Sequence, residues 1–415
     1  MKTYKVSNSW ISKALHWANA HYQYISYHQN NGIEYPHEGF KHYLAIGTHQ
    51  VIKPSLNCFH ELEKVHNNKW LFGYFGYDLK NEIEGLDSCN VDHLGFPELS
   101  FFEPEILFEL NGNDVKVLIG PETVIETIDN HSVQSIPSSF ESYCADFDKD
   151  TYTATVKKLI EHIIEGDFYE INFCHGFFGD FQSVDTVDTF LKLNGLSPKP
   201  FSCFQKFENH VIICASPERF LKRVADKLIS QPIKGTRPRS QNQEIDEKLK
   251  NELRTDEKEL AENMMIVDLV RNDLAKSSIS GSVVVEEMFG IYSFAQVHQM
   301  ISTVTSTLDQ NTSSIEAIKN AFPMGSMTGA PKRIVMESID LYEKSKRGAF
   351  SGASGYFKPN GDFDFNVLIR SLFLNIESKK YGFYVGSAIT FDAIAELEYE
   401  ECFIKASALM KLLDQ

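Results

Sequence analysis

Short runs in which apolar and polar positions alternate dominate the first part of the chain. Examples are WLFGYFGYDL (70–79) and LSFFEPEILFEL (99–110), where aromatic residues recur at every second or third position. A period of two places successive side chains on opposite faces of a strand. These runs therefore predict half-buried strands within a sheet.

Further along the chain, the apolar positions take on helical spacing in several segments. The spacing predicts helices over about 150–165, 256–276, 331–346 and 395–412, with Gly166 as a stop signal and Pro331 in a first turn. We predict strands at 168–174, 211–224, 227–235, 350–357, 364–374 and 381–390. Strands that follow strands, with helices between groups of them, indicate a large mixed sheet structure rather than a βαβ series.

The segment 128–150 differs from its surroundings because it is polar, rich in serine and weakly patterned. Such a composition favours a linker or a subdomain boundary. We find no internal repeat and no low-complexity segment. With 415 residues, the chain has room for two or three domains or for one large α/β body.

Composition narrows the function classes. The chain is 42% hydrophobic and 12% aromatic, so it can bury a large core. Its formal net charge of −17 argues against binding to nucleic acid, because phosphate backbones require clustered Lys and Arg. An anionic substrate would therefore need a local positive site inside an acidic protein.

Cysteine usage and hydropathy indicate the compartment. The seven cysteines form no CxxC pair, which is typical of neither a disulfide framework nor a zinc site and fits a reducing cytosol. The N-terminal stretch has no unbroken apolar core of a signal peptide, and no run of about 18 apolar residues occurs. We expect a cytoplasmic protein that does not enter the membrane.

Two predicted helices carry pairs of glutamates three residues apart. Glu259 and Glu262 share one face of the first, and Glu398 and Glu401 share one face of the last, with Lys405 one turn further along. Either these are solvated faces with a routine Glu401–Lys405 pair, or four carboxylates converge on a hard cation such as Mg²⁺. The absence of His and Cys at metal-ligand spacing nearby disfavours zinc.

Several single residues allow two readings each. GSMTGAPKR (325–333) is a glycine-rich turn before a helix, which can hold an anion or simply cap the helix. Arg370 lies inside the apolar run NVLIRSLFLN and needs an ion pair or an anionic ligand. His298 reads as a satisfied histidine rather than a catalyst. The Cys174-His175-Gly176 stretch reads as ordinary strand rather than a thiol catalyst.

The stretch QPIKGTRPR (231–239) places a lysine, Lys234, between strand-like and turn-like residues. Taken alone, Lys234 reads as a solvated charge at a bend. The alternative is a buried amine held over a substrate.

Taken together, these stretches resemble the chorismate-utilising enzyme family. The resemblance extends over about 145–412 and, more faintly, through GYFGYDL (73–79) in an N-terminal region of about 1–140. The matching blocks, in family order, are GDFYEINF (166–173), ASPERFL (215–221), PIKGTRPR (232–239), KELAENMMIVDLVRNDL (258–274), VHQMISTV (297–304), FPMGSMTGAPK (322–332), LIRSL (368–372) and ELEYEECFIKA (396–406).

This resemblance implies an α+β fold in which a large two-sheet antiparallel sandwich is flanked by helices. It also implies chorismate and Mg²⁺ between the sheets. The site residues that the resemblance implies have four roles. Glu262 and Glu401 would bind Mg²⁺ with support from Glu259 and Glu398; Arg370, Lys405, Thr328 and the backbone near Gly386 would hold the substrate carboxylates; Gly235 and Thr236 would line the site beside Lys234; and His298 would lie near the departing hydroxyl.

The lysine selects a branch of the family. PIKGT resembles the large subunit of the branch that converts chorismate and ammonia to 4-amino-4-deoxychorismate for 4-aminobenzoate and folate. Anthranilate and isochorismate synthases typically have Ala at the position of Lys234. In the lysine branch the amine adds to C2 of chorismate, ammonia then adds at C4, and we expect burial or a nearby cation to lower the pKa of Lys234.

The chain departs from the family pattern at a few positions. Gly386-Ser387-Ala388 stands where a glycine triplet is usual, and Glu170 stands where Gln is common, with no expected contact to the metal set. No cysteine has a glutaminase-like GxCxGxQ setting, so ammonia is expected from a separate glutamine amidotransferase subunit. We expect no fused lyase. Two alternatives stay open: an anthranilate synthase component I, and an idle relative that only binds an amidotransferase.

Overall fold

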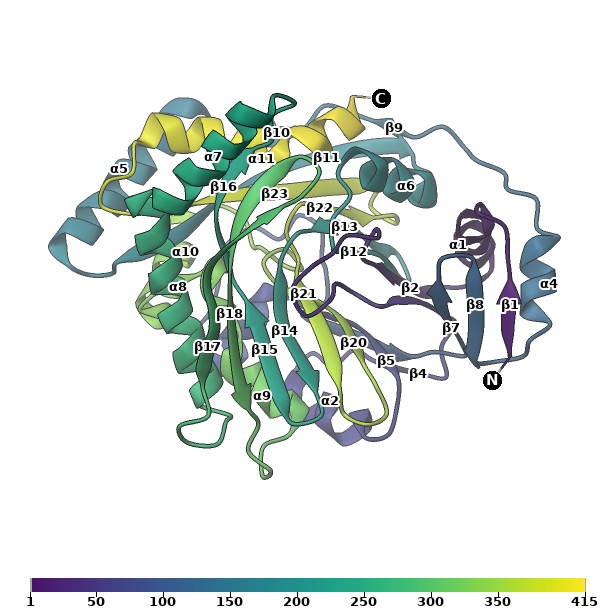
Figure 1. The fold of residues 1–415 in the computed structure, drawn as a ribbon. Coiled ribbons are helices and arrows are strands. Elements are labelled where there is room, and N and C mark those ends of the chain that lie inside the picture. Colours follow the sequence, from purple (N-terminus) through teal and green to yellow (C-terminus); the bar gives the residue numbers. More distant parts are fainter. Residues whose placement is uncertain (1, 415) are drawn as a thin grey trace.

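The computed structural model describes residues 2–414, which form two large antiparallel sheets with helices packed against them (Figure 1). Within these residues one sheet has thirteen strands and the other has ten. The predicted α+β fold with two antiparallel sheets is confirmed. The two sheets share one buried layer, and the predicted site residues lie at its edge.

The thirteen-stranded sheet contains strands from both ends of the chain. In order across the sheet they are β1 (Thr3–Lys5), β8 (Asp114–Ile119), β7 (Ile106–Asn111), β3 (His42–Ile46), β2 (Tyr24–Gln29), β12 (Phe201–Phe207), β13 (His210–Ser216), β22 (Ser371–Asn375), β23 (Lys380–Ile389), β11 (Glu170–Ser183) and β10 (Cys144–Ala145), with β9 (Ser139–Phe140) and β19 (Gly329–Ala330) also pairing with β11.

The ten-stranded sheet faces it. Its strands, in order, are β16 (Ile233–Pro238), β18 (Val297–Thr307), β15 (Lys227–Gln231), β14 (Arg219–Val224), β21 (Phe363–Val367), β20 (Ala353–Phe357), β5 (Leu71–Phe75), β6 (Leu99–Glu103) and β4 (Gln50–Ile52), with β17 (Val284–Ser293) also pairing with β18.

Helices cover the outer surfaces. They are α1 (Trp10–His21), α2 (Cys58–His66), α3 (Lys80–Glu84), α4 (Val124–Asp129), α5 (Lys149–Glu165), α6 (Thr186–Leu196), α7 (Gln243–Thr255), α8 (Glu257–Ala275), α9 (Ser314–Ala321), α10 (Lys332–Tyr342) and α11 (Ala395–Leu413), with short 3-10 turns η1 (Tyr77–Leu79) and η2 (Gly325–Met327).

The four predicted helices are confirmed, and local chemistry explains their ends. Asp148 accepts a hydrogen bond from the Thr151 amide at the start of α5, and Gly166 ends that helix with a φ of 90°. α10 is shorter than predicted, because it ends at Tyr342 and Pro331 is its N-cap rather than part of its first turn. Helix α7 was not predicted.

Two apolar clusters hold the layers together. One lies between the sheets and includes Tyr74 of β5 and Phe207 of β12, whose ring centroids are 5.1 Å apart. The other packs α1, α5, α6 and α11 on the outer face of the thirteen-stranded sheet, with Phe190 and Leu409 among its members. Burying both faces of this sheet supplies most of the apolar contact in the molecule.

The early strands are more deeply buried than their alternation indicates. All five residues of β5 are buried, and so are four of the five in β6, so the prediction of half-buried strands is wrong there. Aromatic residues face both sides of these strands, since Tyr74 and Phe75 are adjacent in β5 and Phe101 and Phe102 are adjacent in β6. Both sides are covered in the folded chain, which a period of two cannot reveal.

The N-terminal segment is built into the same two sheets as the rest. β2 pairs with β12, and β5 pairs with β20, across long stretches of sequence. Residues 130–138 connect the two segments without regular structure and run along the outside in Figure 1. The division near residue 140 between an N-terminal region and a chorismate-binding region therefore stays a prediction from the sequence.

The run predicted as one strand over 364–374 is two strands in different sheets. β21 ends at Val367 in the ten-stranded sheet, and β22 begins at Ser371 in the thirteen-stranded sheet. Arg370 lies at the crossing with a φ of 54°, in the left-handed region. The strand predictions over 211–224 and 227–235 are likewise each divided into two strands.

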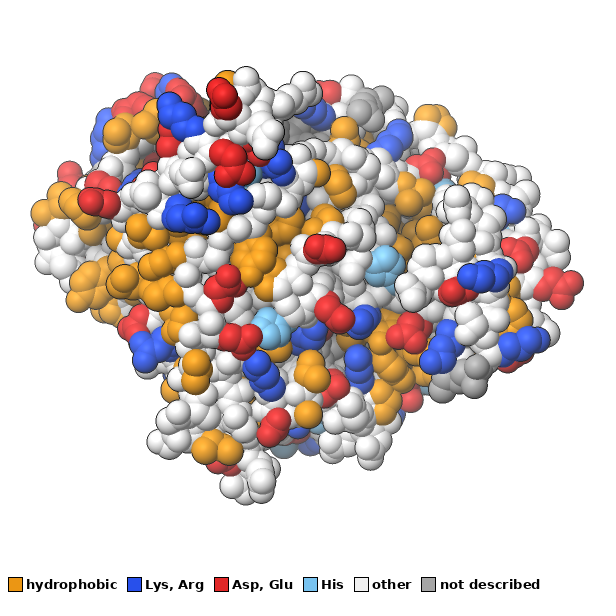
Figure 2. Space-filling model, viewed as in Figure 1, with side chains coloured by type: hydrophobic (Ala, Val, Ile, Leu, Met, Phe, Trp, Pro, Cys, Tyr) orange, Lys and Arg blue, Asp and Glu red, His pale blue; other side chains and the backbone are white. Residues whose placement is uncertain are grey.

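The surface is mixed, with one apolar area. Figure 2 shows hydrophobic side chains gathered on the side where α8, α10 and β17 lie. Exposed apolar residues on these elements include Met264, Met288 and Leu341. Among residues 2–414, no helix is both long enough and apolar enough to cross a bilayer.

A buried ion pair links β14 to β21 inside the ten-stranded sheet. The Arg219 guanidinium donates to both carboxylate oxygens of Asp364, at 2.9 and 3.1 Å, and both side chains are almost fully buried. Arg219 also lies over the Phe201 ring, 4.7 Å from its centroid, and donates to the carbonyl oxygen of Glu38. This one side chain therefore satisfies polar groups on three separate segments.

We expect Arg219→Met to lower the free energy of unfolding by ~3–5 kcal/mol, because Asp364 would be left as an uncompensated buried charge. Urea denaturation followed by circular dichroism measures the change. The matched control is Arg333→Met, whose exposed pair with Glu337 should contribute less than about 1 kcal/mol. Equal losses in the two variants would contradict the structural role of Arg219.

Candidate active site

The predicted site residues come from a few neighbouring elements at the edge of the layer between the sheets. β11, β23 and β16 lie near one another in the upper part of Figure 1, with α8 and α11 beside them. The predicted site residues are Lys234, Gly235 and Thr236 on β16; Glu259 and Glu262 on α8; His298 on β18; Thr328 after η2; Arg370 between β21 and β22; Gly386 on β23; and Glu398, Glu401 and Lys405 on α11.

Lys234 is a buried amine and not the solvated charge that its local sequence favours. Its side chain is 11% exposed. The ammonium donates a hydrogen bond to Glu170 Oε1 at 2.5 Å and lies 4.0 Å from Glu262 Oε2. Glu170 belongs to β11 of the opposite sheet, so this pair connects the two sheets.

The expected direction of the Lys234 pKa is wrong. Burial favours the neutral amine, but the negative charges of Glu170 and Glu262 outweigh burial and raise the pKa of Lys234. The resting state therefore holds an ammonium. Glu170, for which no contact with the predicted metal ligands was expected, binds the lysine directly.

Glu262 carries the excess negative charge of this cluster. Because Lys234 lies closer to Glu170 than to Glu262, its positive charge is largely balanced by Glu170. Burial, together with repulsion from Glu170 and Glu259, raises the pKa of Glu262 to about 7. Lys258, one turn earlier on α8, lies 3.9 Å away and opposes that rise.

Glu259 lies on the same face of α8, as predicted from the spacing, but it has a different partner. It accepts a hydrogen bond from Arg237 at 2.9 Å. Gly235 fits between β16 and this carboxylate, because a Cβ added there would be 3.1 Å from Glu259 Oε2. The φ of +87° at Gly235 also favours glycine. Thr236 is exposed.

On α11 the glutamates have contrasting surroundings. Although burial favours its neutral form, Glu401 has a lowered pKa because Lys405 contacts it at 2.6 Å. The routine pair between Glu401 and Lys405 is therefore present. Burial and the neighbouring Glu401 raise the pKa of Glu398, and a hydrogen bond with Ser387 moderates that rise. Ser387, one departure from the glycine triplet, thus contacts a predicted ligand.

These carboxylates suit a hard cation in their chemistry. All offer oxygen atoms, and burial, followed by repulsion from neighbouring carboxylates, raises the pKa of Glu262 and of Glu398. Glu170 Oε2 is buried without a hydrogen-bond partner. In residues 2–414, however, groups of three ligand atoms within 4.8 Å of one another do not include these glutamates. The Mg²⁺ ligand assignment stays a prediction.

Arg370 is positioned to attract an anion. Its guanidinium donates to the carbonyl oxygen of Lys405 at 2.5 Å, and burial lowers its pKa to about 10. Among residues 2–414 no carboxylate lies within 4.0 Å of it, so the alternative of a direct structural ion pair loses support. Lys405, in turn, donates to the carbonyl oxygen of Gly386 at 2.8 Å.

The glycine-rich turn contributes backbone rather than free side chains. Thr328 is fully buried, and its hydroxyl donates to the carbonyl oxygen of Met324 at 3.1 Å. Gly329 follows with a φ of +148°, and a Cβ there would be 2.0 Å from the carbonyl oxygen of Glu170. Glycine therefore allows β19 to pair with β11, and the Asn172 amide donates to the carbonyl oxygen of Thr328 at 2.7 Å.

His298 is fully engaged by the protein. Its Nδ1 contacts the Ser293 hydroxyl at 2.8 Å, and its Nε2 contacts Asp246 Oδ1 at 3.1 Å. Asp246 also pairs with Arg239. This agrees with a satisfied histidine, and a place near a departing hydroxyl stays a prediction.

The Cys174-His175-Gly176 stretch lies inside β11, as its pattern indicates. Burial raises the pKa of Cys174 and lowers that of His175 to about 4, so neither forms the ion that a thiol catalyst needs.

Sequence reasoning missed two carboxylates at this site. Besides Glu170, Glu218 is buried near Lys234, and burial raises its pKa to about 7 even though Ser326 donates a hydrogen bond to it at 2.7 Å. Each lies within an apolar or strand-like run, the same signal that singled out Arg370. A carboxyl group with this pKa can exchange protons near neutral pH.

Comparisons with known proteins agree with one another. The family model described as chorismate binding enzyme matches residues 14–411. Aminodeoxychorismate synthase from Streptomyces griseus is 40% identical over 268 residues, and the match covers 64% of this chain but only 37% of that protein. Anthranilate synthase component 1 from Acetivibrio thermocellus is 32% identical over 372 residues, covering 83% of this chain and 74% of that protein.

The fold is also found in solved structures. Anthranilate synthase component I from Streptococcus pneumoniae TIGR4 matches with a TM-score of 0.77 and 25% sequence identity. The match covers 92% of this chain and 89% of that chain.

We expect Glu170→Gln to lower the pKa of Lys234, because it removes the nearest negative charge and leaves burial to favour the neutral amine. Competitive labelling with acetic anhydride as a function of pH, read by mass spectrometry of the Lys234 peptide, measures the change. The matched control is Glu63→Gln on partly exposed α2 surface. An unchanged or higher titration midpoint in Glu170→Gln would overturn this account of the pair.

Proposed function

Because the chain belongs to the chorismate-binding enzyme family, we propose that this chorismate-utilising enzyme converts chorismate and ammonia to 4-amino-4-deoxychorismate. The observation that carries the proposal is the buried amine of Lys234 at the edge of the layer between the sheets. A buried lysine that has acidic groups beside it is suited to covalent catalysis.

In the proposed reaction the Lys234 nitrogen bonds to ring carbon C2, the ring double bonds shift, and the hydroxyl at C4 leaves as water. Ammonia then bonds to C4, the double bonds shift back, and the bond between C2 and the lysine breaks. The amine must first lose a proton. Glu170 is its hydrogen-bond acceptor, so that proton can pass to this carboxylate.

Glu218 is the second candidate for proton transfer. It is buried, and its pKa of about 7 allows it to exist in either form at neutral pH. We propose that Glu218 gives a proton to the departing hydroxyl. It lies close enough to Lys234 for the lysine charge to lower its pKa, so both groups can act on the same substrate. Raising a carboxyl pKa by burial is a common way to obtain such an acid.

The remaining groups would orient the substrate. Arg370 and Lys405 supply positive charge for the two carboxylates of chorismate, with Thr328 and the Gly386 backbone beside them. We propose that Glu262 and Glu401 bind Mg²⁺, supported by Glu259 and Glu398. The ion would neutralise charge on the ring carboxylate and assist departure of the hydroxyl.

We propose that ammonia reaches this chain from a glutamine amidotransferase subunit. Names of the type "component 1" among the relatives fit an enzyme of more than one subunit. The apolar area on the side of α8, α10 and β17 in Figure 2 offers exposed surface for a partner. Tested without that partner, this chain would use free ammonium.

Anthranilate synthase component I is the second candidate. It is favoured by the relative from Acetivibrio thermocellus, which this chain matches over more of both lengths than it does the Streptomyces griseus protein. A non-catalytic subunit that only binds an amidotransferase is a third class. Lys234 together with the four glutamates of α8 and α11 makes that class the weakest.

We expect the purified protein, incubated with chorismate, ¹⁵N-ammonium and Mg²⁺, to form a product in which labelled nitrogen replaces the C4 hydroxyl. Mass spectrometry and nuclear magnetic resonance identify it. Glutamine in place of ammonium, without a partner, should give no product. Fluorescent anthranilate with release of pyruvate would overturn the proposal in favour of the second candidate, and no turnover would favour the third.

Lys234→Ala should lower the rate of product formation on the order of 100-fold or more, because the nucleophile is lost. In the unaltered protein, chorismate without ammonia should leave a covalent adduct on the Lys234 peptide, detectable by mass spectrometry after rapid quenching. The matched control is Lys227→Ala on neighbouring β15, whose exposed ammonium pairs with Glu286. Unchanged kinetics in Lys234→Ala would remove the covalent step.

A further inference from the structure

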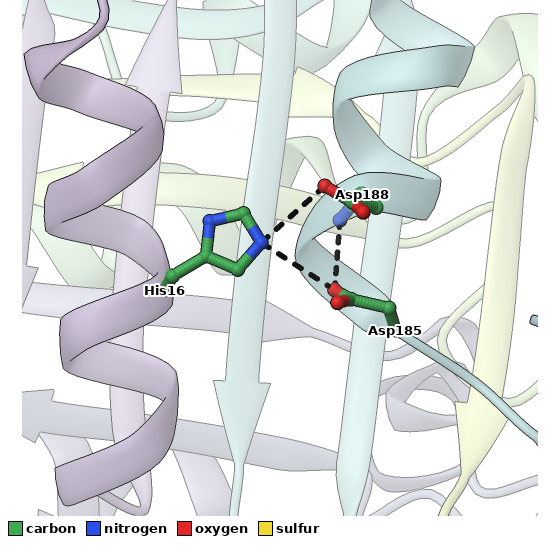
Figure 3. Close-up of side chains that lie close together, drawn as sticks. All are labelled: His16, Asp185 and Asp188. Atoms are coloured by element: carbon green, nitrogen blue, oxygen red, sulfur yellow. Dashed lines mark hydrogen bonds and ion pairs between the residues drawn. The ribbon is translucent and has the colours of Figure 1, made fainter. Parts of the chain in front are cut away.

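A second cluster of polar side chains lies far along the chain from the residues used above. His16 of α1 points toward Asp185 and Asp188 at the start of α6 (Figure 3). The His16 Nε2 atom is 3.3 Å from Asp188 Oδ1 and 3.7 Å from Asp185 Oδ1. Donor atoms of all three residues lie within 4.8 Å of one another.

The tautomer of His16 is set by its other nitrogen. Nδ1 lies 2.8 Å from the carbonyl oxygen of Ser12, which can only accept, so Nδ1 carries a hydrogen. Nε2 of the neutral ring therefore has a lone pair directed at two carboxylates. An Nδ1–H held by a backbone carbonyl, with Nε2 free, is how metal-binding histidines are commonly oriented.

His16 Nε2 is a buried nitrogen without a hydrogen-bond partner. The side chain is only 7% exposed. A buried polar atom left unpaired is costly, and no hydrogen bond joins Nε2 to the carboxylate oxygens 3.3 and 3.7 Å away. A divalent cation between the three groups would satisfy the lone pair and both carboxylates together.

The spacing fits a metal shell better than a direct contact. Zn–N and Zn–O distances of ~2.0–2.2 Å in a tetrahedral shell place neighbouring ligand atoms about 3.4 Å apart. The two measured separations, 3.3 and 3.7 Å, bracket that value. Asp188 is partly exposed, with 31% of its side chain accessible, so water can complete the shell and the ion has a route of entry.

Charge balance supports the same conclusion. Among residues 2–414, neither Asp185 nor Asp188 has a Lys or Arg within 4.0 Å, and His16 is their only basic neighbour at that distance. Asp185 is 7% exposed and also caps α6 by accepting from the Asp188 amide at 3.0 Å. A divalent cation would supply the positive charge that no Lys or Arg supplies to these two carboxyl groups.

Groups around the carboxylates hold them in place. The Ser135 hydroxyl donates to Asp188 Oδ2, and the Ile136 amide donates to Asp185 Oδ2 at 3.4 Å. Both donors belong to the irregular segment 130–138, which crosses over this part of the molecule. These hydrogen bonds hold the Oδ2 atoms, and the Oδ1 atom of each aspartate faces His16.

A second cluster of one histidine and two acidic residues differs in its hydrogen bonding. His162, Glu165 and Asp167 also lie close together, but both nitrogens of His162 have partners. Its Nδ1 contacts Asp167 Oδ2 and its Nε2 contacts the Tyr342 hydroxyl, each at 2.7 Å. That cluster is exposed and satisfied, so it provides a control and not a second site.

We propose that His16, Asp185 and Asp188 form a binding site for one divalent transition-metal ion, of which Zn²⁺ is the best fit. Imidazole with two carboxylates favours such an ion over Mg²⁺ or Ca²⁺, which prefer oxygen ligands throughout. The bound ion ties α1 of the N-terminal segment to α6, which follows β11. Its role is structural, and it is separate from the cation expected at the glutamates.

The test is Zn²⁺ binding to the full chain by isothermal titration calorimetry, with excess Mg²⁺ present to occupy oxygen-only sites. One Zn²⁺ per chain is expected, and Co²⁺ in its place should give the visible absorption of a four-coordinate site. His16→Gln and Asp188→Asn should each weaken Zn²⁺ affinity roughly 100-fold or more, while His162→Gln should leave it unchanged.

A second measurement covers a variant that fails to fold. Zn²⁺ should raise the thermal midpoint of the unaltered protein and of His162→Gln, but not that of Asp188→Asn, whose substitution is on partly exposed helix surface. Absence of Zn²⁺ binding to the unaltered protein, or equal binding by it and Asp188→Asn, would overturn the proposal. Either result would leave His16 as a direct partner of the two aspartates without a metal ion.

Discussion

Because the two sheets bury one face against each other, polar groups at the rim of the shared layer have to satisfy one another. Lys234 and Glu170 do so from opposite sheets, at a separation of 2.5 Å. Both side chains are largely buried, so each charge acts strongly on its neighbours. Burial raises the pKa of Glu262 and of Glu218, whereas the neighbouring carboxylates raise that of Lys234 against the effect of burial.

Side chains of both signs lie at this rim. Carboxylates of β11 and α8 surround Lys234, whereas Arg370 and Lys405 supply positive charge where the chain crosses between the sheets and where α11 begins its second half. An acidic protein with a net charge of −17 thus keeps a local place for an anion. A dianionic substrate with a metal ion would bridge the two regions, which is the arrangement that the proposed chemistry requires.

The N-terminal segment contributes to both sheets, so it belongs to the same packed body as the catalytic residues. β2 and β5 pair with strands that come more than a hundred residues later, and α1 packs on the sheet beside α6. The proposed metal site at His16 would strengthen that connection at the outer surface. Residues 130–138 then need no regular structure, since pairing elsewhere holds the segments together.

The sequence by itself determined the local elements and the residues able to carry the chemistry. Helical spacing placed α5, α8 and α11, and the Glu259–Glu262 and Glu398–Glu401 spacing placed each pair on one helix face. These patterns depend only on neighbours a few residues away. They also identified the family, because its motifs are short and lie in a fixed order.

The tertiary structure alone decided which of those residues meet. An apolar run around Arg370 has the same pattern whether it forms one strand or crosses between two sheets, and only sheet pairing separates the cases. Burial alone would lower the pKa of Lys234. Glu170, 64 residues earlier, reverses that direction because the register of β11 brings its carboxylate to the lysine. Long-range register has no local signature, so the sequence could not reveal it.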